Sequence, residues 1–480
     1  MQTQTLSGDC KQDAQRIRTL FGNADDLILK PLVINHFNAF GLYLDGLCDE
    51  ERIIRAVTQP LTDPACFSSR AHTAKQILLT AYKGADVKTA DTLSKTADGI
   101  LAGNFIILLE GETNAFLFAA QGFPRMPVGQ AQSEQNEFGG REGFNDTLKD
   151  NIALLRRKVN NPQLCIEQRT VGESCRAGVA VCYLAGKADA EMIVKVKKNL
   201  TAAKMDTLLG SGWLRPFLNG GNYSVFPATG ITERPDVLAY KLSVGRIGIL
   251  VDGSPFALIV PYLFTDYFHA PDDYVTGRVY AFFIRSLRLL CFLIALTLPA
   301  FFVAVCDFHP NMLPSEVMFK IASAEAQTPF PLALEAVAIH LIYEFVREAG
   351  LRMPKAAGHT VSIVGALVIG DAAVKAGLIA APMLIVVAVT TVCSAVVSKL
   401  QDRLAVLRLL LIAAGALSGF FGIFLGLGLL TAEICSVSPY GVPLSAPLSP
   451  FEKRAFADGI LRTGVSGSAL QKPTAGDLKF

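Results

Sequence analysis

Charged residues are scarce in this chain. They make up 18% of its 480 residues, whereas hydrophobic residues make up 51%, and the mean hydropathy is +0.38. Soluble proteins average about 25% charged residues. This deficit argues against a wholly soluble protein and predicts that part of the chain faces lipid. The length exceeds that of one ordinary domain and indicates two or three.

An excess of basic residues is also missing. The chain has 44 Lys and Arg residues against 42 Asp and Glu residues, a formal net charge of +2. Proteins that bind nucleic acid carry a marked positive footprint. We therefore expect no nucleic-acid partner.

Motifs for catalysis and metal binding are absent from the sequence. The ten cysteines show no C-x-x-C pair, and the six histidines are scattered, so neither a zinc site nor a disulfide framework is indicated. Phosphate-binding loops, dinucleotide-binding turns, H-E-x-x-H and G-x-S-x-G are not found. We expect no catalytic residues, no metal and no cofactor, and thus a protein that is not an enzyme.

Long uncharged segments are confined to the second half of the chain. Three of them, Leu289–Cys306, Ala376–Ser398 and Leu409–Ala432, are long enough to cross about 30 Å of hydrocarbon as helices. Two weaker apolar segments, Phe330–Val346 and Thr360–Leu378, carry a few charges. We predict a polytopic membrane domain of about four to five helices.

The two ends of the first segment differ in charge. Arg285 and Arg288 precede it and Asp307 follows it. Because positive residues gather on the cytoplasmic side, this order predicts a cytoplasmic amino-terminal region. The polar start of the chain contains no apolar stretch typical of a cleaved secretory signal, in agreement with that orientation.

The amino-terminal half contains an internal duplication at an offset of about 140 residues. Tyr43–Gly46 matches Tyr183–Gly186, and Gly103–Gly111 parallels Gly245–Gly253. Each pair combines an apolar strand with a glycine turn. The pattern predicts two related α/β subdomains.

The predicted fold is therefore an α/β cytoplasmic region of two related subdomains, followed by an all-α polytopic membrane domain. The expected boundaries are 1–122 for the first subdomain, 123–143 for a linker, 144–280 for the second subdomain, 281–434 for the membrane domain and 435–480 for a Pro-rich loop and polar tail.

A few polar side chains fall at the predicted membrane depth, where an unpaired charge is unfavourable. Glu335, His340 and Glu344 are candidate residues lining an ion pathway. Asp371 and Lys375 are four residues apart and share a helix face. This second group is a candidate intramembrane ion pair, with a polar pathway lining as the alternative.

Four glycines of the last apolar segment form two small-xxx-small pairs. Gly415 pairs with Gly419, and Gly422 pairs with Gly426. Such pairs bring helix backbones into close contact. They predict helix packing in a homo-oligomer.

Several motifs together resemble a known family. In the second half they are Pro314–Glu316, Pro329–Ala336, Glu344–Lys355 and Val361–Leu378. In the first half they are Arg141–Phe144, Leu154–Lys158, Thr232–Asp236 and Val251–Phe256. In these stretches the chain resembles the GerA-type spore germination proteins, specifically the A subunit of nutrient germinant receptors, with Pro329, Phe330 and Pro331 as a family motif.

The resemblance implies a multi-pass protein of the spore inner membrane. It further implies assembly with a B-type, transporter-like subunit, with a C-type lipoprotein subunit and with copies of itself. The assembly is expected to form or gate a nutrient-triggered cation channel that starts germination.

Three other functions compete with this interpretation. One is an accessory germination protein resembling SpoVAF, which belongs to the same family. Another is a secondary transporter with a cytoplasmic regulatory domain, which the broken apolar segments would permit. The third is a membrane-anchored enzyme, which the missing catalytic motifs disfavour.

Overall fold

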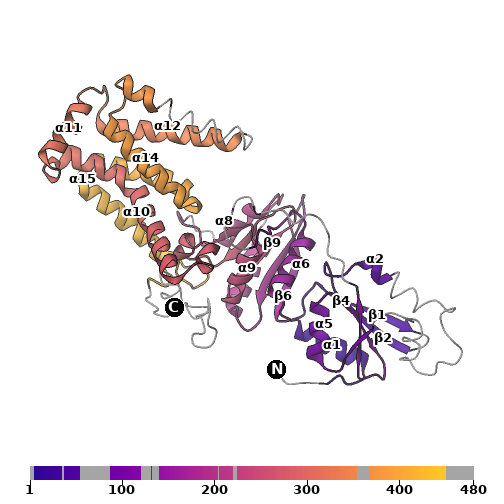
Figure 1. The fold of residues 1–480 in the computed structure, drawn as a ribbon. Helices are drawn as coiled ribbons and strands as arrows, with labels where there is room; N and C mark the ends of the chain where they lie inside the picture. Colours follow the sequence, from indigo (N-terminus) through magenta and orange to yellow (C-terminus); the bar gives the residue numbers. More distant parts are fainter. Residues whose placement is uncertain are drawn as a thin grey trace.

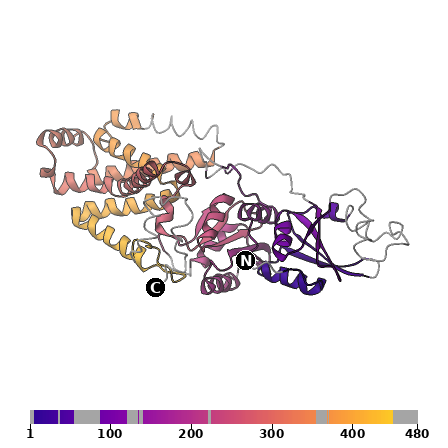
Figure 2. The same cartoon turned by 60° about the horizontal axis from the view of Figure 1, so that its bottom comes forward.

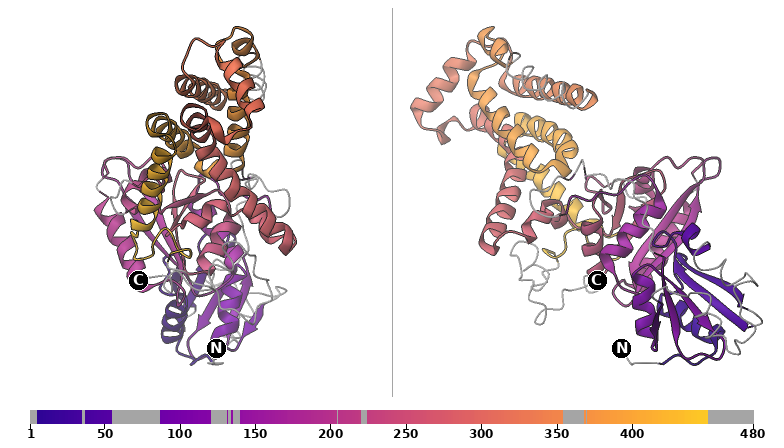
Figure 3. Two further views of the ribbon diagram at one scale, coloured as in Figure 1. Left: turned by 90° about the vertical axis from the view of Figure 1, so that its left-hand side faces the viewer. Right: turned by 45° about the vertical axis from the view of Figure 1, so that its right-hand side comes forward.

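The computed structural model describes residues 5–34, 37–54, 87–120, 140–203, 205–219, 224–353 and 370–449, together with Ala131, Glu134 and Val368. Two α/β subdomains and a helical region follow one another in a row (Figure 1). Figure 3 shows from two further directions that the helical region extends from the side of the second subdomain. Most of the predicted linker and the tail from residue 450 onward lie outside the described residues.

The first subdomain is an antiparallel sheet of order β1-β2-β4-β5-β3. Helices α1 and α5 pack on one face of the sheet through a shared apolar core. Asp9 begins α1 by accepting hydrogen bonds from the Lys11 and Gln12 amides, as an N-cap residue does. The elements are α1 Cys10–Leu20, β1 Leu27–Ile34, β2 Phe37–Leu44, α2 Glu50–Arg52, β3 Lys88–Ala90, α5 Leu93–Leu101, β4 Asn104–Leu109 and β5 Ala115–Ala119.

The second subdomain repeats this topology, with the strand order β6-β7-β9-β10-β8. Helices α6 and α9 cover one face of its sheet, and α7 and α8 cover the other. The elements are α6 Leu148–Val159, β6 Leu164–Val171, β7 Ala177–Leu184, α7 Ala190–Ala202, η3 Ser211–Leu214, α8 Arg215–Leu218, β8 Gly230–Thr232, α9 Pro235–Ser243, β9 Ile247–Val251, β10 Ala257–Val260, η4 Phe264–Phe268 and η5 Pro271–Tyr274.

Equivalent turns of the two subdomains use equivalent glycines. Gly46 after β2 has φ +83° and Gly186 after β7 has φ +77°, while Gly111 and Gly253 have φ +82° and +76°. Backbone with positive φ is favourable only for glycine among ordinary residues. The predicted duplication is confirmed, because both the strand order and these turns recur.

A buried ion pair joins the two subdomains. Arg156 of α6 donates two hydrogen bonds of 2.7 Å to the Asp26 carboxylate, which lies just before β1. Both side chains are 1% exposed. This bidentate geometry is the strongest form of an Arg–carboxylate contact.

The helical region begins with a long apolar helix, α10, which contains Pro299. The elements are α10 Arg278–Phe308, η6 Pro310–Met312, α11 Ser315–Glu325, α12 Leu332–Arg352, α14 Ala381–Val396, η7 Ser398–Leu400 and α15 Gln401–Ser436. Within the described part of the chain, two helical stretches are long and apolar enough to cross a membrane, Arg278–Phe308 and Ser398–Ser436, and Ala381–Val396 is a shorter apolar helix. The predicted all-α character of this region is confirmed.

Helix α15 does not run straight through the segment predicted as one span. Gly419 interrupts it with φ 61° and ψ −139°, and the two halves form a V in Figure 2. A Cβ atom placed on Gly422 would overlap the Ala414 carbonyl oxygen of the other half. The predicted span Leu409–Ala432 is therefore a helical hairpin.

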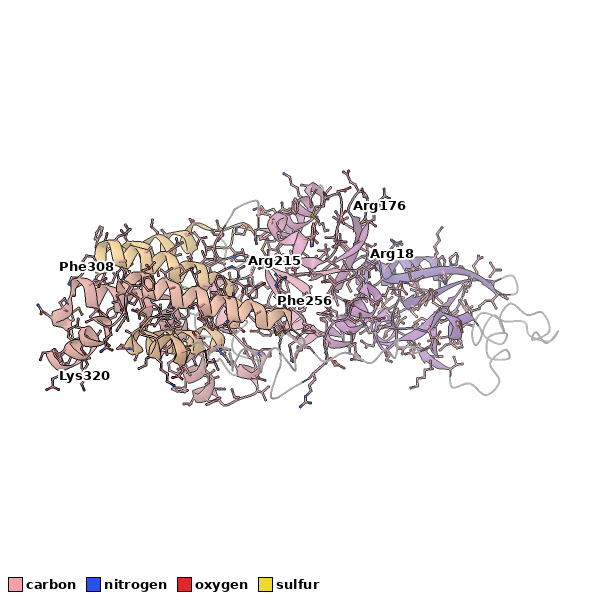
Figure 4. The ribbon with its side chains drawn as sticks, turned by 90° about the horizontal axis from the view of Figure 1, so that it is seen from above. Arg18, Arg176, Arg215, Phe256, Phe308 and Lys320 are labelled. Atoms are coloured by element: carbon pink, nitrogen blue, oxygen red, sulfur yellow. The ribbon has the colours of Figure 1, made fainter. Side chains whose placement is uncertain are left out.

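The far end of the helical region is marked by Phe308 and Lys320 (Figure 4). The hairpin turn lies there, because a Cβ atom on Gly419 would be 3.1 Å from the Phe308 ring. The second half of α15 returns to the soluble region, where Glu433 accepts a hydrogen bond of 2.8 Å from the Val225 amide. The chain thus crosses the helical region twice within α15.

Residues 437–449 pack against the second subdomain. Tyr440, Val442 and Ala446 are buried in the same core as α7 and α8, and the Tyr440 hydroxyl donates to the Leu218 carbonyl oxygen at 2.5 Å. This segment therefore lies on the same side of the helical region as the two subdomains.

Candidate functional site

Glu335 joins the starts of two helices. It lies in the first turn of α12, is 1% exposed, and accepts a hydrogen bond of 2.6 Å from the Ala380 amide at the start of α14. A carboxylate is stabilised by the positive end of a helix dipole. In the single chain Glu335 therefore holds two helix termini together.

His340 and Glu344 lie farther along α12 and approach α15. His340 is 2% exposed, and its Nδ1 lies 2.7 Å from the Ala336 carbonyl oxygen, so this nitrogen is the donor. Glu344 forms a 2.8 Å ion pair with Arg347. The structure thus groups two of the three predicted lining residues and places Glu335 apart from them.

Asp371 and Lys375 form an ion pair of 2.7 Å on a helical segment at 370–375. Their side chains are 59% and 75% exposed in the single chain. A pair so exposed to water contributes little to stability. A role at membrane depth stays a prediction.

The structure shows the surroundings of the remaining predicted residues in the single chain. Pro331 is the N-cap of α12, and Phe330 is 45% exposed. Each of the four predicted glycines faces its own chain, with Ala300, Phe308, Ala414 and Leu411 as the nearest contacts of Gly415, Gly419, Gly422 and Gly426. Contacts between subunits stay a prediction.

Arg408 is a site residue that the sequence argument missed. It lies on α15, is 2% exposed, and donates to the Ala295 carbonyl oxygen of α10 at 2.9 Å and to the Ser394 hydroxyl of α14. It also interacts electrostatically with Glu344 and Tyr343 of α12. Arg408 directly precedes the uncharged segment Leu409–Ala432, and no pattern in the sequence shows that α10 and α14 enclose it.

A cluster of buried charges lies where the soluble and helical regions meet. Lys241 of α9 forms a 2.6 Å ion pair with Asp266 of η4, and both side chains are nearly inaccessible. Arg246 approaches the same carboxylate at 3.7 Å. A cavity of about 200 Å³ beside them is also lined by Tyr262 and by Lys399 of the helical region.

Two further contacts tie the helices to the soluble region. Lys399, in the turn between α14 and α15, forms a 3.0 Å ion pair with Glu134. Asp273 of η5 binds Arg285 at 3.2 Å and Arg288 at 2.7 Å, both on α10. A movement of α10 or of the α14–α15 turn must therefore disturb charged groups of the soluble region.

The Asp266 pair predicts a dependence of stability on pH. Burial by itself raises the pKa of the Asp266 carboxyl, but the charges of Lys241 and Arg246 outweigh burial and hold this pKa well below its usual range. The unfolded chain then takes up a proton at Asp266 before the folded chain does. Its contribution is present above about pH 4 and is lost as the pH falls further. Between pH 7 and pH 3, the midpoint of thermal unfolding should fall less for Asp266→Asn than for the unchanged protein. An equal fall in both proteins would contradict this assignment.

Metal ligation finds no support in the part of the chain that the structure describes, because no group of three His, Cys, Asp or Glu side chains converges there. The arrangement is one of buried ion pairs and helix contacts. It is suited to transmitting movement between two regions and to placing charge inside a helical region.

Comparison with known proteins identifies the family. A family model described as Bacillus/Clostridium GerA spore germination protein matches residues 15–473. The chain belongs to the GerA family. The resemblance found in its motifs is thereby confirmed, and it extends beyond those motifs into the first subdomain.

Relatives of known name are similar over most of their length. Spore germination protein KA of Bacillus subtilis (strain 168) is 34% identical over 92% of this chain and 82% of its own length. The uncharacterized membrane protein YfkQ of the same organism is 32% identical over 96% and 90%. Spore germination protein GerLA of Bacillus cereus is 30% identical over 95% and 94%.

A solved structure is also similar to the soluble region. It is the N-terminal domain of the A subunit of the Bacillus megaterium spore germinant receptor GerK3, 24% identical, with a TM-score of 0.44, covering 55% of this chain and 99% of that one. Membership of the GerA family and the two long apolar helices together indicate association with a membrane.

Proposed function

We propose that this GerA-family protein is the A subunit of a spore nutrient germinant receptor. The family match over residues 15–473 carries the proposal. In this role the chain spans the spore inner membrane several times, with its soluble region in the cytoplasm. It assembles with a B-type transporter-like subunit, a C-type lipoprotein subunit and further copies of itself.

The distribution of charge supports this orientation. Arg285, Arg288, Lys399 and Arg403 lie at the end of the helices next to the soluble region. Positive residues gather on the cytoplasmic side of membrane helices. Residues 437–449 pack on the second subdomain, so in this proposal they lie on the cytoplasmic side as well.

In this proposal, nutrient-triggered movement opens a path for monovalent cations through the helical region of the assembly. The polar groups inside that region, His340, Glu344 and Arg408, support the idea, because buried ionisable groups in membrane helices commonly mark ion pathways. The ion pairs at the junction with the soluble region supply a mechanical link.

Deletion of the gene tests the proposal. Spores that lack it should lose germination on one nutrient or a small set of nutrients, and a plasmid copy should restore the response. A uniform delay on all nutrients would instead favour an accessory role. Normal germination on every nutrient would leave the receptor function unsupported.

A further inference from the structure

Arg408 carries a positive charge that the structure does not neutralise directly. Its Nε and Nη2 atoms donate to a neutral carbonyl and a neutral hydroxyl, and its Nη1 atom is buried with no hydrogen-bond partner among the residues that the structure describes. The Glu344 carboxylate of α12 acts on Arg408 electrostatically, but its direct contact is with Arg347, at 2.8 Å. Arg347 also approaches the Asp402 carboxylate of α15 at 3.7 Å. Among the described residues, Arg347 therefore has two carboxylates in reach, whereas Arg408 has no carboxylate in direct contact.

This charge lies inside the helical region, on the side nearer the soluble region. Arg408 lies about 10 Å along α15 from its first residue, and its contacts reach α10 and α14 directly. Guanidinium remains charged at any physiological pH. In a medium of low dielectric constant, such a charge repels other cations over many ångströms.

We propose that Arg408 is the residue whose charge excludes cations from the helical region at rest. The inference rests on the proposed function, because it requires that this region conducts cations once a nutrient is bound. Glu344 is the counter-charge. When its carboxylate turns from Arg347 toward Arg408, the barrier is neutralised and the path opens.

The experiment measures potassium release from intact spores that carry full-length variants, with and without nutrient, at matched amounts of protein in the inner membrane. Arg408→Gln removes the charge and should raise nutrient-independent release about tenfold or more. Arg408→Lys keeps the charge, and its potassium release should be close to that of the unchanged protein.

Glu344→Gln removes the counter-charge and should act in the opposite direction, reducing potassium release after nutrient addition. Arg352→Gln is the matched control, because this arginine of α12 is exposed and forms a surface ion pair with Glu348.

A purely structural role for Arg408 predicts a different order. Lysine cannot reproduce the two directed hydrogen bonds of the guanidinium group, so a clamp would make Arg408→Lys leak as much as Arg408→Gln. That result would overturn the proposal, as would an unchanged resting release in Arg408→Gln. If Arg408→Gln does not reach the membrane, the other two variants still test the proposal. Potassium release without nutrient from Arg408→Lys spores would contradict the proposal, and so would faster nutrient-triggered release from Glu344→Gln spores. Failure of the receptor function itself is recognised separately, by normal nutrient responses in the deletion strain.

Discussion

Replacement of Gly422 by leucine should unfold or displace the hairpin of α15. A side chain at this position would enter the space of the Ala414 carbonyl group on the opposite half of the helix. Backbone cannot move aside as the end of a flexible side chain can, so the two halves must separate. Overpacking typically lowers stability by about 1–3 kcal/mol, and a clash with backbone belongs at the upper end of that range. Thermal unfolding of the detergent-solubilised protein should show the loss as a lower midpoint.

Gly428 provides the matched control in the same helix. A Cβ atom there would meet nothing within 4 Å, and removing a helical glycine gains about 0.5–1 kcal/mol. Gly428→Leu should therefore be neutral or slightly stabilising. Light scattering of both variants measures the size of the oligomer, so that an effect on assembly can be told apart from an effect on the unfolding midpoint. Unchanged stability together with a smaller oligomer for Gly422→Leu would show that this glycine packs between subunits instead.

Removal of the Asp26 carboxylate should have an effect of similar size in the soluble region. Asp26→Asn leaves the Arg156 guanidinium buried between the subdomains without its counter-charge. Removing one partner of a buried ion pair typically lowers the free energy of unfolding by about 3–5 kcal/mol, and we expect a loss of about that size here. Denaturant unfolding followed by circular dichroism should report the loss.

Two variants decide whether the charge is the cause. Asp91→Asn breaks an ion pair with Lys95 whose side chains are 59% and 64% exposed, and it should leave the stability nearly unchanged because both groups are solvated. Replacing both Asp26 and Arg156 by apolar residues of similar volume should recover much of the loss, because no unpaired charge remains. A double variant as unstable as Asp26→Asn would contradict the electrostatic explanation.

The duplicated soluble region could be predicted from the sequence because its signals are local. A strand that ends in a glycine turn needs no distant partner to be recognised, and Gly46 and Gly186 adopt positive φ at equivalent turns. The family motifs could be recognised for the same reason, because each is a short continuous stretch of sequence. Ion pairs such as Arg156 with Asp26 join residues 130 positions apart, and nothing local in either residue indicates the other.

In the helical region, the path of the chain could not be predicted from the sequence. An uncharged run such as Leu409–Ala432 is long enough for a straight span, and hydropathy is the same whether a helix continues or turns back. The left-handed backbone at Gly419 and the close approach of Gly422 to Ala414 show that it turns back. The burial of Arg408 could not be predicted either, because charge patterns do not reveal which side chains the neighbouring helices enclose.

The sequence by itself determined the two related α/β subdomains, the apolar second half and the membership of the GerA family. Each of these depends on composition, periodicity or short motifs, which the chain carries locally. The tertiary structure alone decided the hairpin in α15, the return of residues 437–449 to the second subdomain and the enclosure of Arg408. These features arise from contacts between distant segments, because burial and pairing are properties of the packed chain as a whole.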